Sequence, residues 1–216
     1  MSIYNQGILG GFTGKTGAVI GSSWKNKAVM RSLPKLKKSR KSSQFQLEQQ
    51  EKFRLMISFL TSFQDLLNIT FKRRSTGQTG INAALSVNLR NGILGTESPF
   101  SINYEKLEFS YALGTLPNVA NPTATAAAGN SLDFEWTNNA GASRAKNTDK
   151  TILIVYCPEL NQSMYFIDTA KRSEEFANID ASIFAGKSVE TWMLFITDDM
   201  STASNTVYTG SVNLIP

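Results

Sequence analysis

The chain has 216 residues, of which 41% are hydrophobic and 18% charged, enough apolar material for one large domain or two small ones. It contains no histidine, and Cys157 is its one cysteine. These absences exclude histidine-based catalysis, an intramolecular disulfide and metal sites built from several thiolates of one chain. We therefore expect a protein that is not an enzyme and needs no cofactor or metal.

Charge is divided unequally along the chain. Residues 1–90 contain fifteen Lys or Arg against three acidic residues, a net charge of +12, whereas residues 91–216 contain seven against fourteen, a net charge of −7. Two interpretations fit this asymmetry. The basic half binds nucleic acid or another polyanion, or it binds the acidic half of another copy in a head-to-tail association.

Residues 1–41 are predicted to form a glycine-rich basic arm or hairpin. The glycines are too frequent for a helix interior, where each costs about 1 kcal/mol relative to alanine, and short apolar runs between them suit strands. Gly14-Lys15-Thr16 suggests a phosphate-binding loop, but the preceding glycine is one residue out of place and no helix-forming run follows. Because this segment can bury little by itself, we expect it to lie against another surface, with the assembly contacts Gly10, Gly11, Phe12, Gly14 and Trp24.

Eight cations without an acidic residue follow within residues 25–41. Such a run can follow a phosphate backbone without base specificity. A linker, or an arm that docks on a neighbour's acidic half, is the favoured alternative, because only Trp24 and Phe45 are nearby to stack on bases. The candidate polyanion or partner contacts are Lys25, Lys27, Arg31, Lys35, Lys37, Lys38, Arg40 and Lys41.

Residues 42–96 are predicted to form a helical hairpin. Ser43 and Gln46 match a capping box at the start of a long amphipathic helix that ends near Phe71. A shorter helix is expected over about 80–91, with a left-handed stop at Asn91-Gly92. The apolar face of the long helix recurs every three or four residues, at Phe53, Met56, Ile57, Leu60, Phe63 and Leu67.

After Thr96 the apolar period changes to two. Seven short strands separated by Asn-, Gly- and Pro-bearing loops describe a β-sandwich over residues 97–216, with Trp136 and Trp192 in its core. The pattern resembles a fibronectin type III or related immunoglobulin-like module, so the expected fold class is α+β, mainly β. The expected strands are 101–104, 107–111, 132–136, 151–156, 164–168, 189–197 and 206–214.

Two loops of the expected sandwich invite functional interpretations. Asp198-Asp199 offers oxygen ligands for calcium, but a turn explains the same residues without a metal. The loop 138–147 offers an exposed surface for a carbohydrate or protein ligand. Cys157, at a strand end without a base nearby, is interpreted as a small apolar residue.

A family resemblance rests chiefly on the opening of the chain. The string GILGGFTGKTG at 7–17 and GSSWK at 21–25, with Asn121-Pro122 and Ser204-Asn205 further on, resembles a family of uncharacterised Bacteroidota proteins of about this length. Asn26 stands where usual members have glycine. The resemblance implies a bacterial or bacteriophage setting and brings no activity or catalytic residue with it.

The leading hypothesis is a self-associating structural protein, such as a bacteriophage virion component, whose partners are further copies or other structural subunits. A nucleic-acid-binding protein is the first alternative, and a surface-displayed sandwich that binds carbohydrate or protein is the second. The first residues show no secretory signal, and no run approaches the roughly 18 apolar residues of a membrane helix. We therefore expect synthesis in the cytoplasm and no membrane span.

Overall fold

The computed structural model describes residues 2–4, 10–24, 27–33, 41–72, 77–111 and 116–215. The chain divides into two compact units, Met1–Ser43 and Gln44–Pro216. The second unit contains both the helices, which were expected as a separate segment over 42–96, and the sandwich, which was expected over 97–216. The fold is α+β and mainly β, as predicted.

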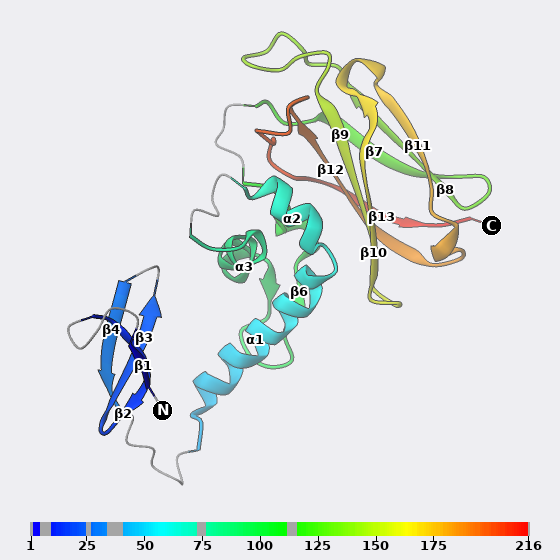
Figure 1. The fold of residues 1–216 in the computed structure, drawn as a ribbon. Coiled ribbons are helices and arrows are strands. Elements are labelled where there is room, and N and C mark those ends of the chain that lie inside the picture. The colour runs from blue at the N-terminus through cyan, green and yellow to red at the C-terminus, as the bar shows by residue number, and fades with distance from the viewer. Residues whose placement is uncertain are drawn as a thin grey trace. The chain divides into compact units, whose positions relative to one another are not determined.

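The first unit is a four-stranded antiparallel sheet in which each strand pairs with the next one along the chain (Figure 1). The predicted arm is therefore a β-meander. Gly17, at φ +57°, occupies the tight turn between the second and third strands, in the left-handed region that favours glycine. The strands are β1 (Ser2–Tyr4), β2 (Phe12–Thr16), β3 (Val19–Trp24) and β4 (Lys27–Ser32).

The expected long helix is interrupted, and this corrects the prediction. Helix α1 covers Gln44–Thr61 and α2 covers Gln64–Thr70. At the break the Ser62 hydroxyl donates to the Phe59 carbonyl, and the Phe63 N–H donates to the Leu60 carbonyl, three residues back, which tightens the turn. Phe53 was also expected to face inward, but its side chain is 49% exposed, because helix α1 is buried only from Met56 onward.

Helix α3 covers Gly80–Asn91, as predicted. The Thr79 side chain caps it by accepting a hydrogen bond from the Asn82 N–H. The predicted left-handed stop is wrong: Gly92 has φ −92°, and its N–H donates to the Asn88 carbonyl.

The C-terminal strands form two antiparallel sheets, with the orders β11-β8-β7 and β10-β9-β12-β13. This arrangement confirms the predicted sandwich of the fibronectin type III kind. A two-stranded sheet of β5 (Ile93–Leu94) and β6 (Ser101–Ile102) precedes it. The sandwich strands are β7 (Ala120–Ala127), β8 (Ser131–Thr137), β9 (Lys150–Cys157), β10 (Gln162–Lys171), β11 (Phe176–Asp180), β12 (Ser188–Ile196) and β13 (Val207–Asn213).

Residues 107–111 were expected to be a strand, and they are not. The Glu108 N–H donates to the Asn88 side chain, and the Phe109 N–H donates to the Thr206 hydroxyl. Side chains of α3 and of the chain before β13 thus take the bonds that a neighbouring strand would supply. Strands β7 and β11 were not predicted.

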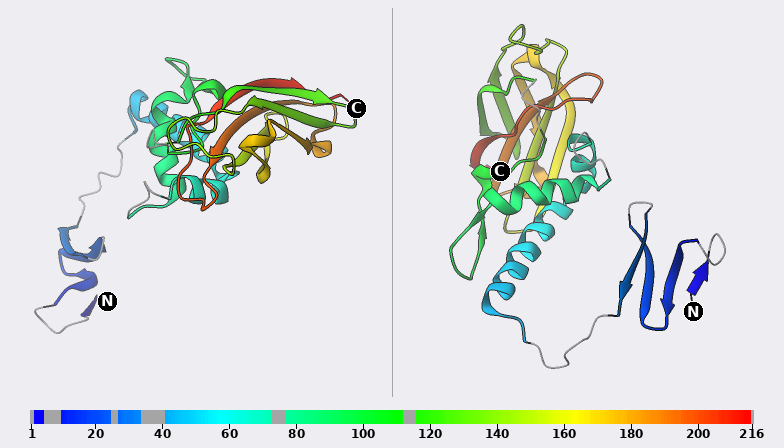
Figure 2. Two further views of the ribbon diagram at one scale, coloured as in Figure 1. Left: turned by 90° about the horizontal axis from the view of Figure 1, so that it is seen from above. Right: turned by 90° about the vertical axis from the view of Figure 1, so that its left-hand side faces the viewer.

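Two cores lie on opposite sides of β9 and β12, so that the second unit has three layers (Figures 1 and 2). Between the sheets pack residues such as Leu153, Met193 and Trp136; between the four-stranded sheet and the helices pack Ile154, Trp192 and their neighbours. Trp136 packs between the two sheets, as predicted, whereas Trp192, which was expected in the same core, packs between the four-stranded sheet and the helices. The helices thus cover the outer face of the four-stranded sheet.

Candidate functional site

The N-terminal sheet carries all its described charge on one face. In the register of β2, β3 and β4, Lys15 pairs with Ile20 and Ile20 with Arg31, while Trp24 pairs with Lys27. Side chains directly opposite one another share a face, and faces alternate along each strand. The cationic face therefore contains Lys15, Ile20, Trp24, Lys27, Val29 and Arg31.

The opposite face carries no charge among its described residues. Gly21 pairs with Gly14 on one side and with Met30 on the other. A Cβ on Gly21 would lie 2.6 Å from the Phe12 ring and 2.3 Å from the Phe12 carbonyl oxygen, so only glycine permits this close packing. The uncharged face consists of Phe12, Gly14, Val19, Gly21, Ala28 and Met30.

The described residues of the first unit cover neither face of this sheet. Among its described residues Gly21 is the one buried residue, and no hydrophobic side chain is buried. Trp24 is 63% exposed and Met30 is 71% exposed. An isolated sheet needs an apolar face packed on a second layer to be stable, and the described part of the unit does not supply that layer.

The predicted contact residues divide between described and undescribed parts of the chain. Lys27 and Arg31 are exposed on β4, and Lys41 is exposed shortly before α1. Lys15 was not among the predicted contacts; the alternation along β2 is the signal that could have identified it. The predicted contacts Lys25, Lys35, Lys37, Lys38 and Arg40 lie outside the described residues.

The predicted assembly residues do not form one surface. Phe12 and Gly14 lie on the uncharged face, whereas Trp24 lies on the cationic face. A Cβ on Gly11 would lie 2.7 Å from that of Ala28, which places Gly11 against β4. Gly10 is half-buried at the entrance to β2.

The beginning of α1 carries exposed apolar side chains. Phe45 is 69% exposed, and Leu47 and Phe53 are also exposed. Another side of the helix is occupied, since the Lys52 ammonium lies 4.4 Å from the centre of the Phe100 ring and the Ser98 hydroxyl donates to Glu51.

The outer face of the β11-β8-β7 sheet is acidic. Glu135 lies between Phe176 and Thr123 in one cross-strand row, and Asp133 lies between Asn178 and Thr125 in the next. Asp180 follows on β11. The three strands contain no Lys or Arg. We call this surface, comprising Thr123, Asp133, Glu135, Phe176, Asn178 and Asp180, the acidic face.

The carboxylates of the acidic face differ in their partners. The Asn178 amide donates to Asp133 at 2.6 Å. Asp180 accepts a hydrogen bond from the Ser182 N–H, which holds the pKa of the Asp180 carboxyl below its usual value. Glu135 is exposed. The acidic face thus presents three carboxyl groups and no basic side chain.

A hollow of about 640 Å³ lies at the loop end of the sandwich, and the predicted binding loop 138–147 forms part of it. Its lining is polar and carries both signs of charge. A binding role for this loop stays a prediction. The lining residues are Leu116, Ser143, Arg144, Lys146, Thr148, Asp149, Thr197, Asp198, Asp199, Ser201 and Thr202.

A buried ion pair lies at this end of the sandwich. The Arg172 Nε donates to Asp149 Oδ2 at 3.0 Å, and both side chains are almost completely buried. Burial lowers the pKa of Arg172, while the Asp149 charge opposes that shift. The guanidinium also donates to the Asn139 side chain and the Pro117 carbonyl, and it lies 3.8 Å from the centre of the Phe195 ring. The pair thus ties three loops to the core.

The carboxylates considered for calcium have other partners. Asp198 pairs with Lys150, and Asp199 accepts hydrogen bonds from the Thr197 hydroxyl and the Ser201 N–H. These bonds lower the pKa of Asp199 to about 2. The described residues contain no group of three or more acidic or Cys side chains placed to hold a metal ion. This arrangement is that of a turn.

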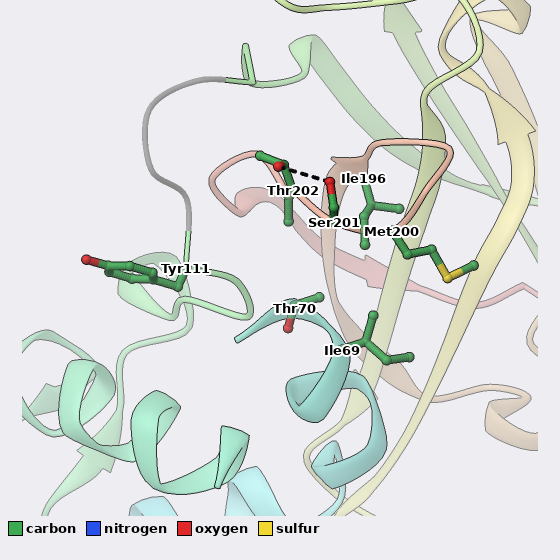
Figure 3. Close-up of a pocket in the computed structure, with 8 residues that line it drawn as sticks. Ile69, Thr70, Tyr111, Ile196, Met200, Ser201 and Thr202 are labelled. Carbon is green, nitrogen blue, oxygen red and sulfur yellow. Dashed lines mark hydrogen bonds between the residues drawn. The ribbon is translucent and has the colours of Figure 1, made fainter. Parts of the chain in front are cut away.

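A small cavity between α2 and the β12–β13 connection has a volume of about 10 Å³, which is at most the space of one water (Figure 3). Ile69 and Thr70 line it from the helix, and Met200, Ser201 and Thr202 line it from the connection. The Thr70 hydroxyl donates to the Phe109 carbonyl beside it. This junction holds the helix on the sandwich and is too small for a ligand.

Two further sequence features are placed by the structure. Gly14, Lys15 and Thr16 lie on β2 and lead into a turn and another strand, so they do not form the helix-capped cradle of a phosphate-binding loop. Cys157 is buried and unbridged.

No described helix combines the length and the apolar character needed to cross a membrane.

Two solved structures are similar to about half of this chain. The fibronectin type III domain of the human collagen alpha-1(XX) chain is 12% identical with a TM-score of 0.38, and the match covers 50% of this chain and 93% of that domain. The FN1–FN3 domains of chicken CNTN1 are 6% identical with a TM-score of 0.39, over 49% of this chain and 35% of that one.

Sequence comparison extends over most of the chain. A search of curated protein sequences finds no match. The model of a family of unknown function, DUF6266, matches residues 11–210, which include strands β2 to β4 of the N-terminal sheet, the helices and all of the sandwich except the end of β13. The chain therefore belongs to the DUF6266 family.

Proposed function

We propose that this protein is a non-catalytic structural subunit that self-associates through its N-terminal sheet and the exposed beginning of α1. The observation that carries the proposal is the sheet of residues 2–32, in which no described hydrophobic side chain is buried. Covering an exposed side chain the size of Met30 contributes roughly 1.5–3 kcal/mol. A partner surface that covers several such side chains would therefore stabilise the sheet substantially.

The second unit supports a structural role in a different way. Its sandwich and helices bury two cores and leave the acidic face and the start of α1 open. A rigid body joined to an uncovered sheet is suited to repeated contacts between identical subunits. We propose a bacteriophage virion, or another repeating bacterial particle, as the setting, in keeping with the resemblance of the chain's opening to a Bacteroidota family.

The proposal is tested by sedimentation velocity of the full chain between 1 and 200 µM. We expect the mean mass to rise with concentration above the 23.7 kDa of one chain. The double variant Phe45→Ser/Phe53→Ser should weaken the association, whereas Leu160→Ser, which removes an exposed apolar side chain between β9 and β10, should not. A single 23.7 kDa species at every concentration would contradict the proposal.

Nucleic-acid binding is the second candidate, and one observation favours it. Trp24 and Lys27 are opposite one another on the face that also carries Lys15 and Arg31. An aromatic surface among cations is the combination that single-stranded nucleic acids contact. Fluorescence anisotropy with a labelled single-stranded oligonucleotide tests it. Binding should weaken steeply with salt and be lost in Lys15→Glu/Arg31→Glu; binding that these substitutions leave unchanged would exclude this face.

A further inference from the structure

We infer that the cationic face of one copy binds the acidic face of a second copy, an inference that rests on the proposed self-association. The cationic face spans the three neighbouring strands β2-β3-β4, and the acidic face is the outer surface of the three strands β11-β8-β7. The described residues of each face carry three charges of one sign and none of the other. The N-terminal unit as a whole contains no acidic residue.

The two charge patterns have similar dimensions. Neighbouring strands are about 4.8 Å apart and residues about 3.4 Å apart along a strand. Lys15 and Arg31, separated by Ile20 on β3, are thus roughly 10 Å apart across the sheet, and Lys27 lies roughly 13 Å from Arg31 along β4. On the other face, Asp180 lies two rows from the Glu135 row, again roughly 13 Å along the strands.

Each face also carries an exposed aromatic residue beside a charge. Trp24 is opposite Lys27 in the last row of the β3–β4 pair. Phe176 is opposite Glu135 in the first row of the β11–β8 pair. Aromatic side chains supply much of the contact energy at protein interfaces. Charge pairing would orient the two faces, and the aromatic residues would contribute apolar contact.

The charges determine which surfaces pair. Two cationic faces, or two acidic faces, would place like charges together, which is unfavourable. The contact therefore joins different surfaces of the two copies, and the pair keeps a free acidic face on one copy and a free cationic face on the other. Such heterologous contacts repeat into a ring or a filament. One such contact buries little surface and leaves its charges exposed to solvent, so we expect it to be weak and sensitive to salt.

The test uses charge reversals in the full chain, followed by sedimentation velocity at 50 and 500 mM NaCl. Lys15→Glu/Arg31→Glu and Asp133→Lys/Glu135→Lys should each weaken self-association at least tenfold, and 500 mM NaCl should weaken the wild type similarly. Controls with the same changes in net charge elsewhere, Arg90→Glu/Lys106→Glu and Glu97→Lys/Glu105→Lys, should leave association within twofold. Circular dichroism checks that each variant is folded.

Mixing provides the decisive arm. In an equimolar mixture of the two interface variants, the reversed sheet faces the reversed sandwich and the native sheet faces the native sandwich, so assembly should return to the wild-type level. If the wild type assembles and Asp133→Lys/Glu135→Lys behaves like its control, or if the mixture stays dissociated, the inference is wrong while self-association stands. If the wild type stays monomeric throughout, the proposed function itself fails.

Two other occupants of the cationic face would be recognised in the same experiment. If Lys15→Glu/Arg31→Glu abolishes oligonucleotide binding but sediments with the same mass distribution as the wild type, the cationic face binds nucleic acid. That result would overturn the inference. Charge reversals that change the shape of a persistent monomer would indicate docking within one chain and would overturn it as well.

Discussion

The buried ion pair between Arg172 and Asp149 permits a quantitative prediction for stability. Arg172→Met keeps much of the apolar stem but removes the guanidinium, which pairs with Asp149 and donates to the Pro117 carbonyl. It also removes the cation over the Phe195 ring. The Asp149 carboxylate, with its Oδ1 already lacking a partner, would be left buried without a counter-charge. Removing one partner of such a pair costs about 3–5 kcal/mol.

For a domain of this size, each kcal/mol lowers the melting temperature by about 2–4 °C. We therefore expect a drop of roughly 6–20 °C for Arg172→Met. Urea unfolding followed by tryptophan fluorescence gives the free energy directly, and Trp136 is a local reporter because its indole N–H donates to the Arg172 carbonyl.

Two comparison variants make this prediction specific. Asp149→Leu/Arg172→Met should cost less than Arg172→Met alone, because no buried carboxylate remains without a counter-charge. Lys187→Met removes an exposed ion pair with Glu159 and should cost under about 1 kcal/mol. A cost below about 1 kcal/mol for Arg172→Met, or a double variant less stable than the single one, would refute the reasoning.

Three further predictions follow from local geometry and charge. Gly80→Ala should lower the melting temperature, because the added Cβ would lie 2.4 Å from the Leu67 carbonyl oxygen. Gly21→Ala should disrupt the N-terminal sheet at Phe12 and reduce self-association, while the melting temperature of the second unit stays unchanged. Burial raises the pKa of Tyr104 to about 12, so the folded state favours the neutral phenol. This preference for the neutral phenol stabilises the fold fully below pH 10, and the stabilisation is lost as pH rises toward 12. Tyr104→Phe should therefore make the loss of stability with rising pH less steep in alkaline unfolding. An unchanged pH profile would contradict the prediction.

Local patterns in the sequence predicted much of the second unit. Helix α3 was placed at its observed bounds, because apolar residues recur at helical spacing within it and Asn91-Gly92 stands at its end. The continuous apolar run of β9 identified a strand buried on both faces. These features are determined by neighbours close in the chain, which a single sequence displays.

The predictions that failed concern features that the local sequence does not distinguish. Strand β7 consists largely of Ala and Thr and begins at a bulge near Pro122, so it lacks an apolar alternation of its own and depends on pairing with β8. The break after α1 is made by Ser62 and Phe63, whose sequence would also continue a helix. Arg172 and Asp149 are 23 residues apart, and nothing near either residue distinguishes them from exposed charges.

The candidate surfaces could be anticipated only in part. The charge imbalance between the two halves was visible in the composition. The assignment of Lys15 and Arg31 to one face required the register of β2, β3 and β4, which depends on the lengths of the turns. The acidic face required β11, a strand that was not predicted, because it places Asp180 and Phe176 beside β8.

Hydrogen exchange of the full chain at two concentrations tests the central claim most directly. The described residues of the N-terminal sheet bury no apolar side chain, so at 1 µM the backbone amides of β2, β3 and β4 should exchange fast, while those of β9 and β12 stay protected. At 200 µM we expect the N-terminal amides to become at least tenfold better protected, with β9 and β12 unchanged. Strong protection of residues 12–32 that is equal at both concentrations would show that the sheet is stable without a partner, and would contradict the account.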